Sequence, residues 1–224
     1  FVIVFNTDKT KGNYKLRIQS GSKLYQLTAN NYDDSSPSIS QGHVSWNTND
    51  VYPGSGRYFT GSKVKKTNVV NPYAGSYSGT DVNGSQAIWV NAKKWLTGNW
   101  SNEIIHFDSK TNKTTEIGDP NLELIDEVPL ISNGTIAFVG TNITQPRYNA
   151  IYIADINNPD SSKRIKRVSK YFEPEIWLKI FQNSNGQLIW GRHFYMNDID
   201  TIYWYKDTIS GNVLPPTKFR NTIP

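Results

Sequence analysis

Acidic residues recur at similar points along this 224-residue chain, and they are the side chains best suited to chemistry. The set comprises Asp33, Asp34, Asp81, Glu127, Glu173 and Glu175. Two carboxylates that face each other across a cleft can act as general acid and base in glycoside hydrolysis, and several together can bind a hard cation. If the chain is an enzyme, we expect the catalytic residues to be Asp34, Glu127 and Glu173. None lies in a motif specific for hydrolysis, so hydrogen bonding to backbone amides at turns is the simpler interpretation.

Aromatic and basic residues form a second candidate set, which is suited to ligand binding. It comprises Tyr52, Trp95, Trp100, Arg147, Tyr148, Arg192, His193 and Tyr195. Trp and Tyr provide a large contact area with little loss of rotamer entropy, and together with Arg they are enriched in binding hot spots. Their flat faces can also stack on sugar rings. The alternative for Trp95 and Trp100 is that they fold back to cover their own loop.

Other kinds of site lack the residues that they need. The absence of cysteine excludes disulfides, thiolate metal sites and cysteine nucleophiles. The three histidines, His43, His106 and His193, are far apart in the sequence and lack the spacing of metal ligands. No G-x-S-x-G motif of a serine hydrolase occurs. We therefore expect neither a metal nor a cofactor.

The charge and hydropathy of the chain bear on its partners. The formal net charge is +5, and the densest basic run is Lys163, Arg164, Lys166, Arg167 and Lys170. Because this run falls on one predicted strand, we interpret it as an edge strand that its charges protect from aggregation, and we do not expect nucleic-acid binding. No apolar run approaches the roughly 20 residues of a membrane helix, so we expect no membrane insertion.

A repeat along the chain must position these side chains. Five apolar segments end in a large aromatic anchor, at Phe5, Trp46, Trp89, Phe138 and Trp190. Successive anchors are 41 to 52 residues apart, which is the period of a four-stranded propeller blade. Segments with partial alternation of apolar and polar residues follow each anchor, such as "YKLRIQS" and "KLYQLT", and turns such as "SKTN" separate them. The pattern predicts antiparallel four-stranded blades, most weakly over residues 51–82.

The units have a recognisable consensus: a strand ending in an aromatic, a strand ending near Asp, and a strand ending in Leu-Thr, Ile-Gly or Val-Ser. This consensus resembles the TolB-type WD40-like repeat (PD40), and "KLYQLTANNYDDSSPSIS" matches it best. The resemblance implies an all-β fold, a β-propeller, of the kind found in periplasmic proteins, peptidases and cell-surface proteins. We expect residues 1–224 to form a single propeller domain with five blades, in which the segment at Pro224 closes the ring. The alternative is a fragment of a larger propeller or of a multidomain surface protein.

One face of such a propeller is the predicted binding face. In a blade, the connections from the second to the third strand share a face with those that lead from the fourth strand to the next blade. The second-to-third connections are long here and contain the aromatic and basic set, as in "NAKKWLTGNWSN" and "GRHFYMNDID". The opposite face has short turns, so we expect ligands on the face of the long connections.

The sequence therefore favours a non-catalytic binding module over an enzyme. We predict an exported or cell-surface propeller, whether extracellular, in the cell envelope or periplasmic, that recognises a protein or glycan partner through the loop face. A glycoside hydrolase or lyase with carboxylates in the central funnel is the alternative. The chain also has N-glycosylation sequons at Asn83, Asn99, Asn112, Asn133 and Asn142, about the number expected by chance, which permit an exported glycoprotein.

Overall fold

The structure is a computed structural model, and it describes most of the chain. The described residues are 2–8, 13–20, 22–29, 31–48, 55–59, 64–66, 78–94, 100–124, 128–144, 148–158, 160, 163–169, 171, 177–182, 188–196, 199–206 and 217–220. From residue 177 on, the description concerns the backbone. Antiparallel strands and turns dominate, and no α-helix occurs within these residues. The described part of the chain thus contains no helix with the length and hydrophobicity that a membrane crossing requires.

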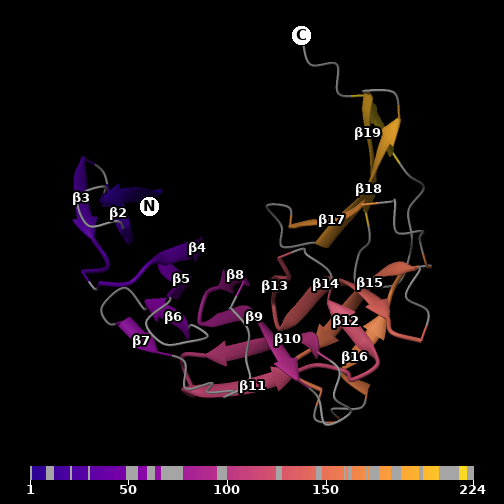
Figure 1. Ribbon diagram of the computed structural model, residues 1–224, viewed down its shortest axis with the longest axis horizontal. Helices are drawn as coiled ribbons and strands as arrows, with labels where there is room; N and C mark the ends of the chain where they lie inside the picture. The colour runs from indigo at the N-terminus through magenta and orange to yellow at the C-terminus, as the bar shows by residue number, and fades with distance from the viewer. Residues whose placement is uncertain are drawn as a thin grey trace. The chain divides into compact units, whose positions relative to one another are not determined.

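The chain divides into two compact units, Phe1–Ile117 and Gly118–Pro224, and each is described by itself. The described strands of the first unit form three antiparallel sheets, in which neighbouring strands follow one another along the chain (Figure 1). Sheet 1 contains β1 (Val2–Asp8), β2 (Asn13–Ser20) and β3 (Lys23–Gln26). Sheet 2 contains β4 (Asp34–Ser40), β5 (His43–Thr48), β6 (Ser55–Phe59) and β7 (Val64–Lys66). Sheet 3 contains β8 (Ser78–Asn83), β9 (Gln86–Lys94), β10 (Trp100–Asp108) and β11 (Lys113–Ile117).

The described strands of the second unit form two further antiparallel sheets. Sheet 4 contains β12 (Leu122–Leu124), β13 (Leu130–Ser132), β14 (Thr135–Asn142), β15 (Asn149–Asp155) and β16 (Ile165–Arg167). Sheet 5 contains β17 (Trp177–Gln182), β18 (Leu188–Met196), β19 (Ile199–Lys206) and β20 (Thr217–Arg220). These sheets confirm the predicted antiparallel units. Whether they form one domain of five blades stays a prediction, and the proposed closing segment at Pro224 lies outside the described residues.

The innermost strand of sheet 4 differs from the predicted pattern. The sequence predicted one inner strand before the anchor Phe138, but two short strands pair with β14. Strand β13 pairs with the beginning of β14, where Ser132 lies opposite Thr135, and β12 pairs with its end, where Leu122 lies opposite Asn142. Leu122 and Leu124 are buried, so the alternating pattern "LEL" adds a second apolar strand to the inner edge.

The anchor aromatics whose side chains are described are core residues, as predicted. Trp46, Trp89 and Phe138 are each at most 1% exposed. Trp46 packs with Leu16 and Ile18 of β2, so it joins sheets 1 and 2. Burying a side chain of this size removes a large apolar area from water, which explains why one aromatic residue recurs in each sequence repeat. The side chains of Phe5 and Trp190 lie outside the described residues.

Trp89 joins sheets 2 and 3 by packing on a glycine. A Cβ atom added to Gly56 of β6 would lie 2.6 Å from Cε2 of the Trp89 ring, so only glycine admits the indole at this distance. The Trp89 Nε1–H group also donates a hydrogen bond of 3.0 Å to the carbonyl of Trp46. Apolar packing and a buried hydrogen bond therefore hold these two sheets together at one residue.

A hydroxyl side chain lies two residues past the outermost described strand in two sheets, after β3 in sheet 1 and after β16 in sheet 4. In sheet 1, the Leu16 N–H group donates to Oγ1 of Thr28 at 3.1 Å. In sheet 4, the Ile151 N–H group donates to Oγ of Ser169 at 2.9 Å. The Leu-Thr and Val-Ser endings seen in the sequence thus supply a hydrogen-bond acceptor to the neighbouring strand, β2 or β15, beyond the last residue that pairs with β3 or β16.

Candidate functional site

The structure describes the predicted binding residues to different extents. Tyr52, Trp95 and Arg147 lie outside the described residues. Trp100 is the first residue of β10, and its backbone pairs with Lys94. Of the predicted set, Tyr148 is the one whose side chain is described.

Three predicted loop residues lie in a strand instead. Arg192, His193 and Tyr195 belong to β18, which continues to Met196, where it pairs with Ile199 of β19. The sequence predicted a long connection here, and the structure leaves residues 197 and 198 between the two strands. Aromatic and β-branched residues make up most of β19 and four of the nine residues of β18, and their preference for pleated structure favours a ladder that continues into the expected connection.

Tyr148 is exposed and its ring lies close to that of a second tyrosine. Its side chain is 42% exposed, immediately before β15. The ring centroids of Tyr148 and Tyr171 are 6.3 Å apart, with an angle of 47° between the ring planes. This distance is within the range of favourable aromatic pairs. The two rings therefore form a tilted aromatic pair on the second unit.

Tyr171 is held by two further side chains. The Cζ atom of Arg167, at the end of β16, lies 4.1 Å from the centroid of the Tyr171 ring, a distance typical of a cation–π contact. The hydroxyl of Tyr152 is hydrogen-bonded to Tyr171. We call these residues, Arg167, Tyr148 and Tyr171, the aromatic–arginine cluster. Tyr152 of β15 contacts the cluster through its hydrogen bond to Tyr171.

The electrostatics of Tyr152 reflect this support. Burial, which has the largest effect, and the hydrogen bond to Tyr171 together raise the pKa of Tyr152 to about 12. The positive charge of Arg167 opposes this shift. The ring of Tyr152 stacks on the anchor Phe138, with centroids 5.8 Å apart. The cluster is thus connected to the buried core of sheet 4.

The cluster combines the two kinds of connection that were predicted to share a face. Tyr148 ends the connection from β14 to β15, which correspond to the second and third strands of the predicted blade. Tyr171 lies after β16, which corresponds to the fourth strand. Sheet 1 shows the same relationship, because Asp33 Oδ1 accepts a hydrogen bond from the Tyr14 N–H group at 2.9 Å and Lys15 Nζ donates to the carbonyl of Tyr32 at 2.7 Å. Tyr14 and Tyr32 are both exposed.

The partners of Tyr148 are not among the predicted binding residues. Tyr171 lies outside the second-to-third connections in which binding residues were expected, and Arg167 belongs to the run interpreted as edge-strand protection. Strand β16 does form an edge of sheet 4, which confirms that part of the interpretation. The useful signal was the segment after the fourth strand, "SKYFEPE", which contains Tyr171.

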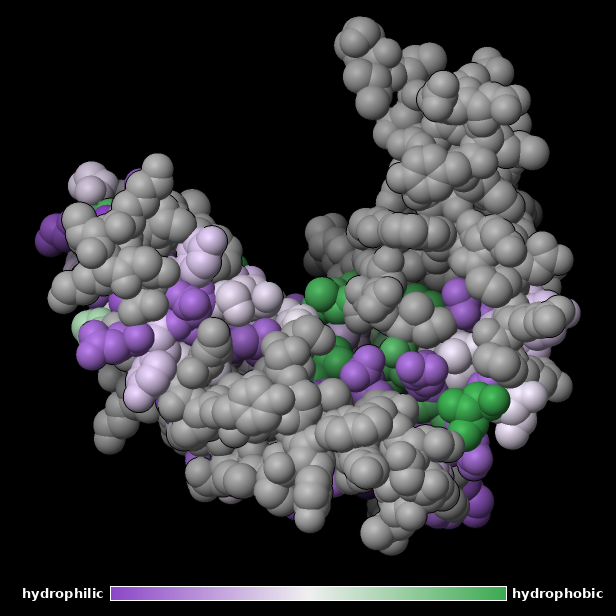
Figure 2. Space-filling model, in the orientation of Figure 1, coloured by the Kyte–Doolittle hydropathy of each residue, from purple (hydrophilic) through white to green (hydrophobic). Residues whose placement is uncertain are grey.

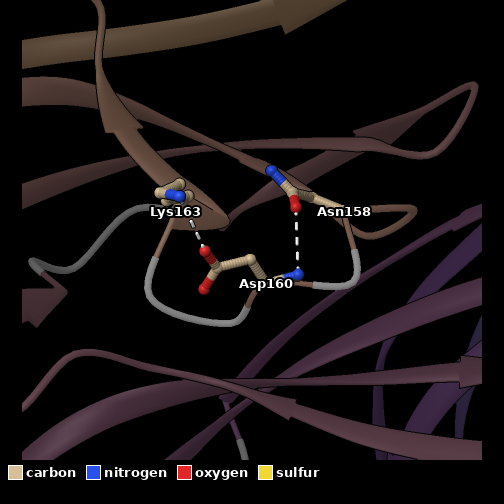
Figure 3. A network of polar contacts seen from close by, with 3 residues as sticks. All are labelled: Asn158, Asp160 and Lys163. Carbon is tan, nitrogen blue, oxygen red and sulfur yellow. Dashed lines mark hydrogen bonds and ion pairs between the residues drawn. The ribbon is translucent and has the colours of Figure 1, made fainter.

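Polar side chains hold the described part of the turn that leads into this basic strand. The Asp160 N–H group donates to Oδ1 of Asn158 at 3.0 Å, and Lys163 Nζ lies 3.1 Å from Oδ2 of Asp160 (Figure 3). At the start of the turn, the Asn157 N–H group donates to Oδ1 of Asp155 at 2.9 Å. The side-chain oxygens of the segment "DINNPD" therefore serve turn amides and an ion pair.

The described acids of the predicted set are engaged with the protein. Asp34 is fully buried, and its Oδ1 accepts a hydrogen bond of 3.0 Å from Trp46 Nε1–H. Asp33 accepts from the backbone amide of Tyr14, which lies in β2 and not in the turn of Asp33, whereas Asp81 accepts from the Ser38 hydroxyl at 2.8 Å and so connects β8 to β4. Glu127, Glu173 and Glu175 lie outside the described residues. Among the described residues, no three His, Cys, Asp or Glu side chains are grouped so that they could hold a metal ion.

Hydropathy alone does not mark a binding surface. In Figure 2, hydrophilic and hydrophobic residues are interspersed over the described surface on the visible face. Among the residues whose side chains are described, the exposed large hydrophobic and aromatic ones are spread along the chain: Tyr14, Leu24, Tyr25, Tyr32, Ile39, Val128 and Tyr148. The aromatic–arginine cluster is distinguished by the contacts among its members.

Comparisons with known proteins bear on the fold. No protein-family model and no curated protein matches the sequence. Similar solved structures include a prolyl endopeptidase (TM-score 0.57, 12% identity), which covers 85% of this chain and 29% of that chain. An acylaminoacyl peptidase from Pyrococcus horikoshii has a TM-score of 0.52 and 9% identity, and covers 91% of this chain and 30% of that chain. An oligogalacturonate lyase from Vibrio parahaemolyticus has a TM-score of 0.56 and 12% identity, and covers 96% of this chain and 62% of that chain.

These neighbours have β-propeller domains, so the fold class predicted from the sequence is confirmed: the chain is an all-β protein with antiparallel propeller blades. The chain spans between 29% and 62% of the length of these neighbours. At identities of 9 to 12%, the similarity concerns the fold alone.

Proposed function

We propose that this chain is a non-catalytic binding module, an exported or cell-surface propeller that recognises a protein or a glycan through its loop face. The observation that supports the proposal is the aromatic–arginine cluster, in which Tyr148 and Tyr171 lie 6.3 Å apart and Arg167 covers the Tyr171 ring. Tyr and Arg are the side chains that most often carry binding energy at interfaces.

The contacts of the cluster favour binding at low entropic cost. Tyr171 is in contact with Tyr148 and Arg167 and is hydrogen-bonded to Tyr152, and Tyr152 stacks on Phe138. A ligand that packs on these rings would immobilise few additional side chains, so less of the interaction energy would be lost to ordering. Tyr148 is exposed, which leaves its ring available for contact.

A pair of variants tests the glycan arm of this proposal. Affinity electrophoresis in gels that contain individual polysaccharides should show retardation of the wild-type chain by at least one of them, and Tyr148→Ala should reduce that retardation at least tenfold in apparent affinity. The matched control is Tyr25→Ala, since Tyr25 is 52% exposed in β3, away from the predicted loop face. Equal retardation of both variants would contradict the assignment of the cluster.

The protein arm requires a different probe. A photo-crosslinking amino acid at position 148, in the full chain expressed in its own cells, should capture a discrete partner, whereas the same amino acid at position 25 should not. Capture of the same species from both positions, or from neither in cells whose polysaccharides also fail to retard the chain, would contradict the binding-module proposal.

The origin and extent of the propeller belong to the same proposal. We assign the repeat to the TolB-type PD40 class, with five blades in a single domain and a location in the periplasm, cell envelope or extracellular space. The support is the period of the aromatic anchors and the hydroxyl that ends the fourth strands at Thr28 and Ser169. Cell fractionation checks the location, and an experimental structure of the full-length gene product checks the number of blades.

A glycoside hydrolase or lyase is the alternative function, and the solved structures similar to this chain include a lyase. Asp34 is the described member of the proposed catalytic trio. Its burial and its hydrogen bond from Trp46 are evidence against this alternative. Single replacement of Asp34, Glu127 and Glu173 by Ala, with turnover measured on polysaccharides that include oligogalacturonate, separates the two functions. Loss of turnover in two of the three variants would overturn the binding-module proposal.

A further inference from the structure

Two buried asparagines lie on the facing sides of sheets 2 and 3. Asn47 of β5 is directly opposite Gly56 of β6, and opposite residues of antiparallel strands share a face. Gly56 faces the Trp89 ring, so Asn47 faces sheet 3 beside that ring. The indole N–H of Trp89 donates to the carbonyl of Trp46, the residue before Asn47. This hydrogen bond places the Trp89 ring next to Asn47.

Asn91 occupies the corresponding side of sheet 3. It lies two residues after Trp89 in β9 and therefore on the same face. Its Nδ2 group donates a hydrogen bond of 3.1 Å to Oε1 of Glu103, the residue opposite it in β10. This hydrogen bond uses Nδ2 of Asn91, so Oδ1 is the group of the amide that is not directed at Glu103.

The two amides present a defined set of unpaired groups. Asn47 is 4% exposed and Asn91 is fully buried. Within the described part of the chain, neither Nδ2 nor Oδ1 of Asn47 has a hydrogen-bond partner, and Oδ1 of Asn91 has none. Buried polar groups in native proteins are nearly always paired with protein or with ordered water, so this set requires an occupant.

The chemistry of the set selects the occupant. Asn47 offers a donor and an acceptor, and Asn91 offers an acceptor. A metal cation would bind the two oxygens and leave the Asn47 N–H groups unpaired, whereas an anion would bind the N–H groups and leave the oxygens unpaired. Water both donates and accepts, and buried water usually makes about three hydrogen bonds.

We propose that sheets 2 and 3 enclose a binding site for ordered water between Asn47 and Asn91, beside Trp89. The water links two blades through side chains, beside the link that Trp89 makes to the Trp46 carbonyl. Ordered water of this kind bridges polar groups almost as well as a direct hydrogen bond. The proposal is independent of the aromatic–arginine cluster, which belongs to the other unit.

A crystal structure of the full chain tests the site directly. We expect a density peak at hydrogen-bonding distance, about 2.7 to 3.2 Å, from the Asn47 amide and from Oδ1 of Asn91. A peak at about 2.3 to 2.6 Å from the oxygens alone would identify a cation such as calcium and overturn the proposal. The absence of any peak would overturn it as well.

Magnetic resonance in solution provides a second readout. The side-chain NH2 protons of Asn47 should show cross-relaxation with a long-lived water, and this signal should be lost in Asn47→Leu and reduced in Asn91→Leu. The matched control is the NH2 group of Asn112, which lies on an exposed turn and should show only rapidly exchanging water. If a leucine variant does not fold, the wild-type signal still decides, because its absence contradicts a bound water.

Discussion

The rings of Tyr148 and Tyr171 lie 6.3 Å apart, although one residue precedes β15 and the other follows β16. The pair exists because β15 begins and β16 ends at the same end of sheet 4, which brings the residues next to these strand ends together. Arg167 covers Tyr171 and Tyr152 binds its hydroxyl, so the exposed pair is joined to the blade core. The next prediction tests that connection.

The phenol of Tyr152 should ionise only at high pH. Its pKa is raised to about 12 in the folded protein, above the value of 10.0 that an unperturbed tyrosine has. The stability that depends on the neutral phenol is therefore complete below about pH 10 and is lost as the pH rises through 12. In tyrosine 13Cζ spectra, a resonance that titrates near pH 12 should be present in the wild type and absent in Tyr152→Phe. A resonance that titrates near pH 10 instead would contradict the burial of this phenol.

His43 should make the protein less stable in mild acid. Burial lowers the pKa of His43 below 6.5, so the unfolded chain takes up this proton first as the pH falls. The contribution of neutral His43 to stability is complete above about pH 6.5 and decreases as the pH falls toward its folded pKa. Urea unfolding between pH 7.5 and 5.5 should show a steeper loss of stability in the wild type than in His43→Gln. Parallel losses would show that this histidine is not responsible.

The ring of His43 also has a defined proton position. The hydroxyl of Tyr58 donates to the carbonyl of Gly84 at 2.8 Å, so its single proton is used there. The contact between the Tyr58 oxygen and Nδ1 of His43 therefore requires the proton on Nδ1. The nitrogen chemical shifts of His43 at pH 8 check this tautomer.

Replacing the hydroxyls that end the fourth strands should destabilise the protein. Thr28→Val removes the acceptor of the buried Leu16 N–H group and keeps the side-chain shape, at a cost of about 1 to 3 kcal/mol. Thr28→Ser keeps the hydroxyl and is the matched control, with a smaller loss. Equilibrium urea unfolding measures both. If the two variants lose the same stability, the hydroxyl is not the reason that Thr occurs at this position.

Gly56 should resist substitution because of Trp89. In Gly56→Ala the new methyl group would lie 2.6 Å from the indole, and relieving that overlap should cost about 1 to 3 kcal/mol in unfolding free energy. The double variant Gly56→Ala with Trp89→Phe should show a coupling energy, because the smaller ring gives room to the methyl group. Additive losses in thermal or urea unfolding would contradict a direct contact.

Asp34 should be a structural residue. Its carboxylate accepts from the buried Trp46 indole, so Asp34→Ala should destabilise the fold by about 1 to 3 kcal/mol. Trp46→Ala should cost more, about 3 to 5 kcal/mol, because it also removes the packing against Leu16 and Ile18. Calorimetry of both variants checks the order. An Asp34→Ala variant with wild-type stability would return this residue to the catalytic candidates.

The sequence predicted the elements of this fold better than the candidate site. Burial of Trp46, Trp89 and Phe138 follows from their recurrence at the ends of apolar segments, which local pattern reveals. The limits of strands were less predictable, as β18 shows by continuing through Arg192 and Tyr195. A charged or aromatic residue near a strand end is compatible with either a loop or a ladder, and cross-strand pairing decides between them.

What the sequence by itself determined was the repeated antiparallel unit, because a period of apolar anchors and turn residues is a local property that each unit carries in its own letters. Only the tertiary structure decided which distant side chains meet: Tyr171 with Tyr148, Asp34 with Trp46, and Trp89 with Gly56. Those contacts depend on how strands pair and sheets pack, and each couples residues whose spacing along the chain carries no signal of the encounter.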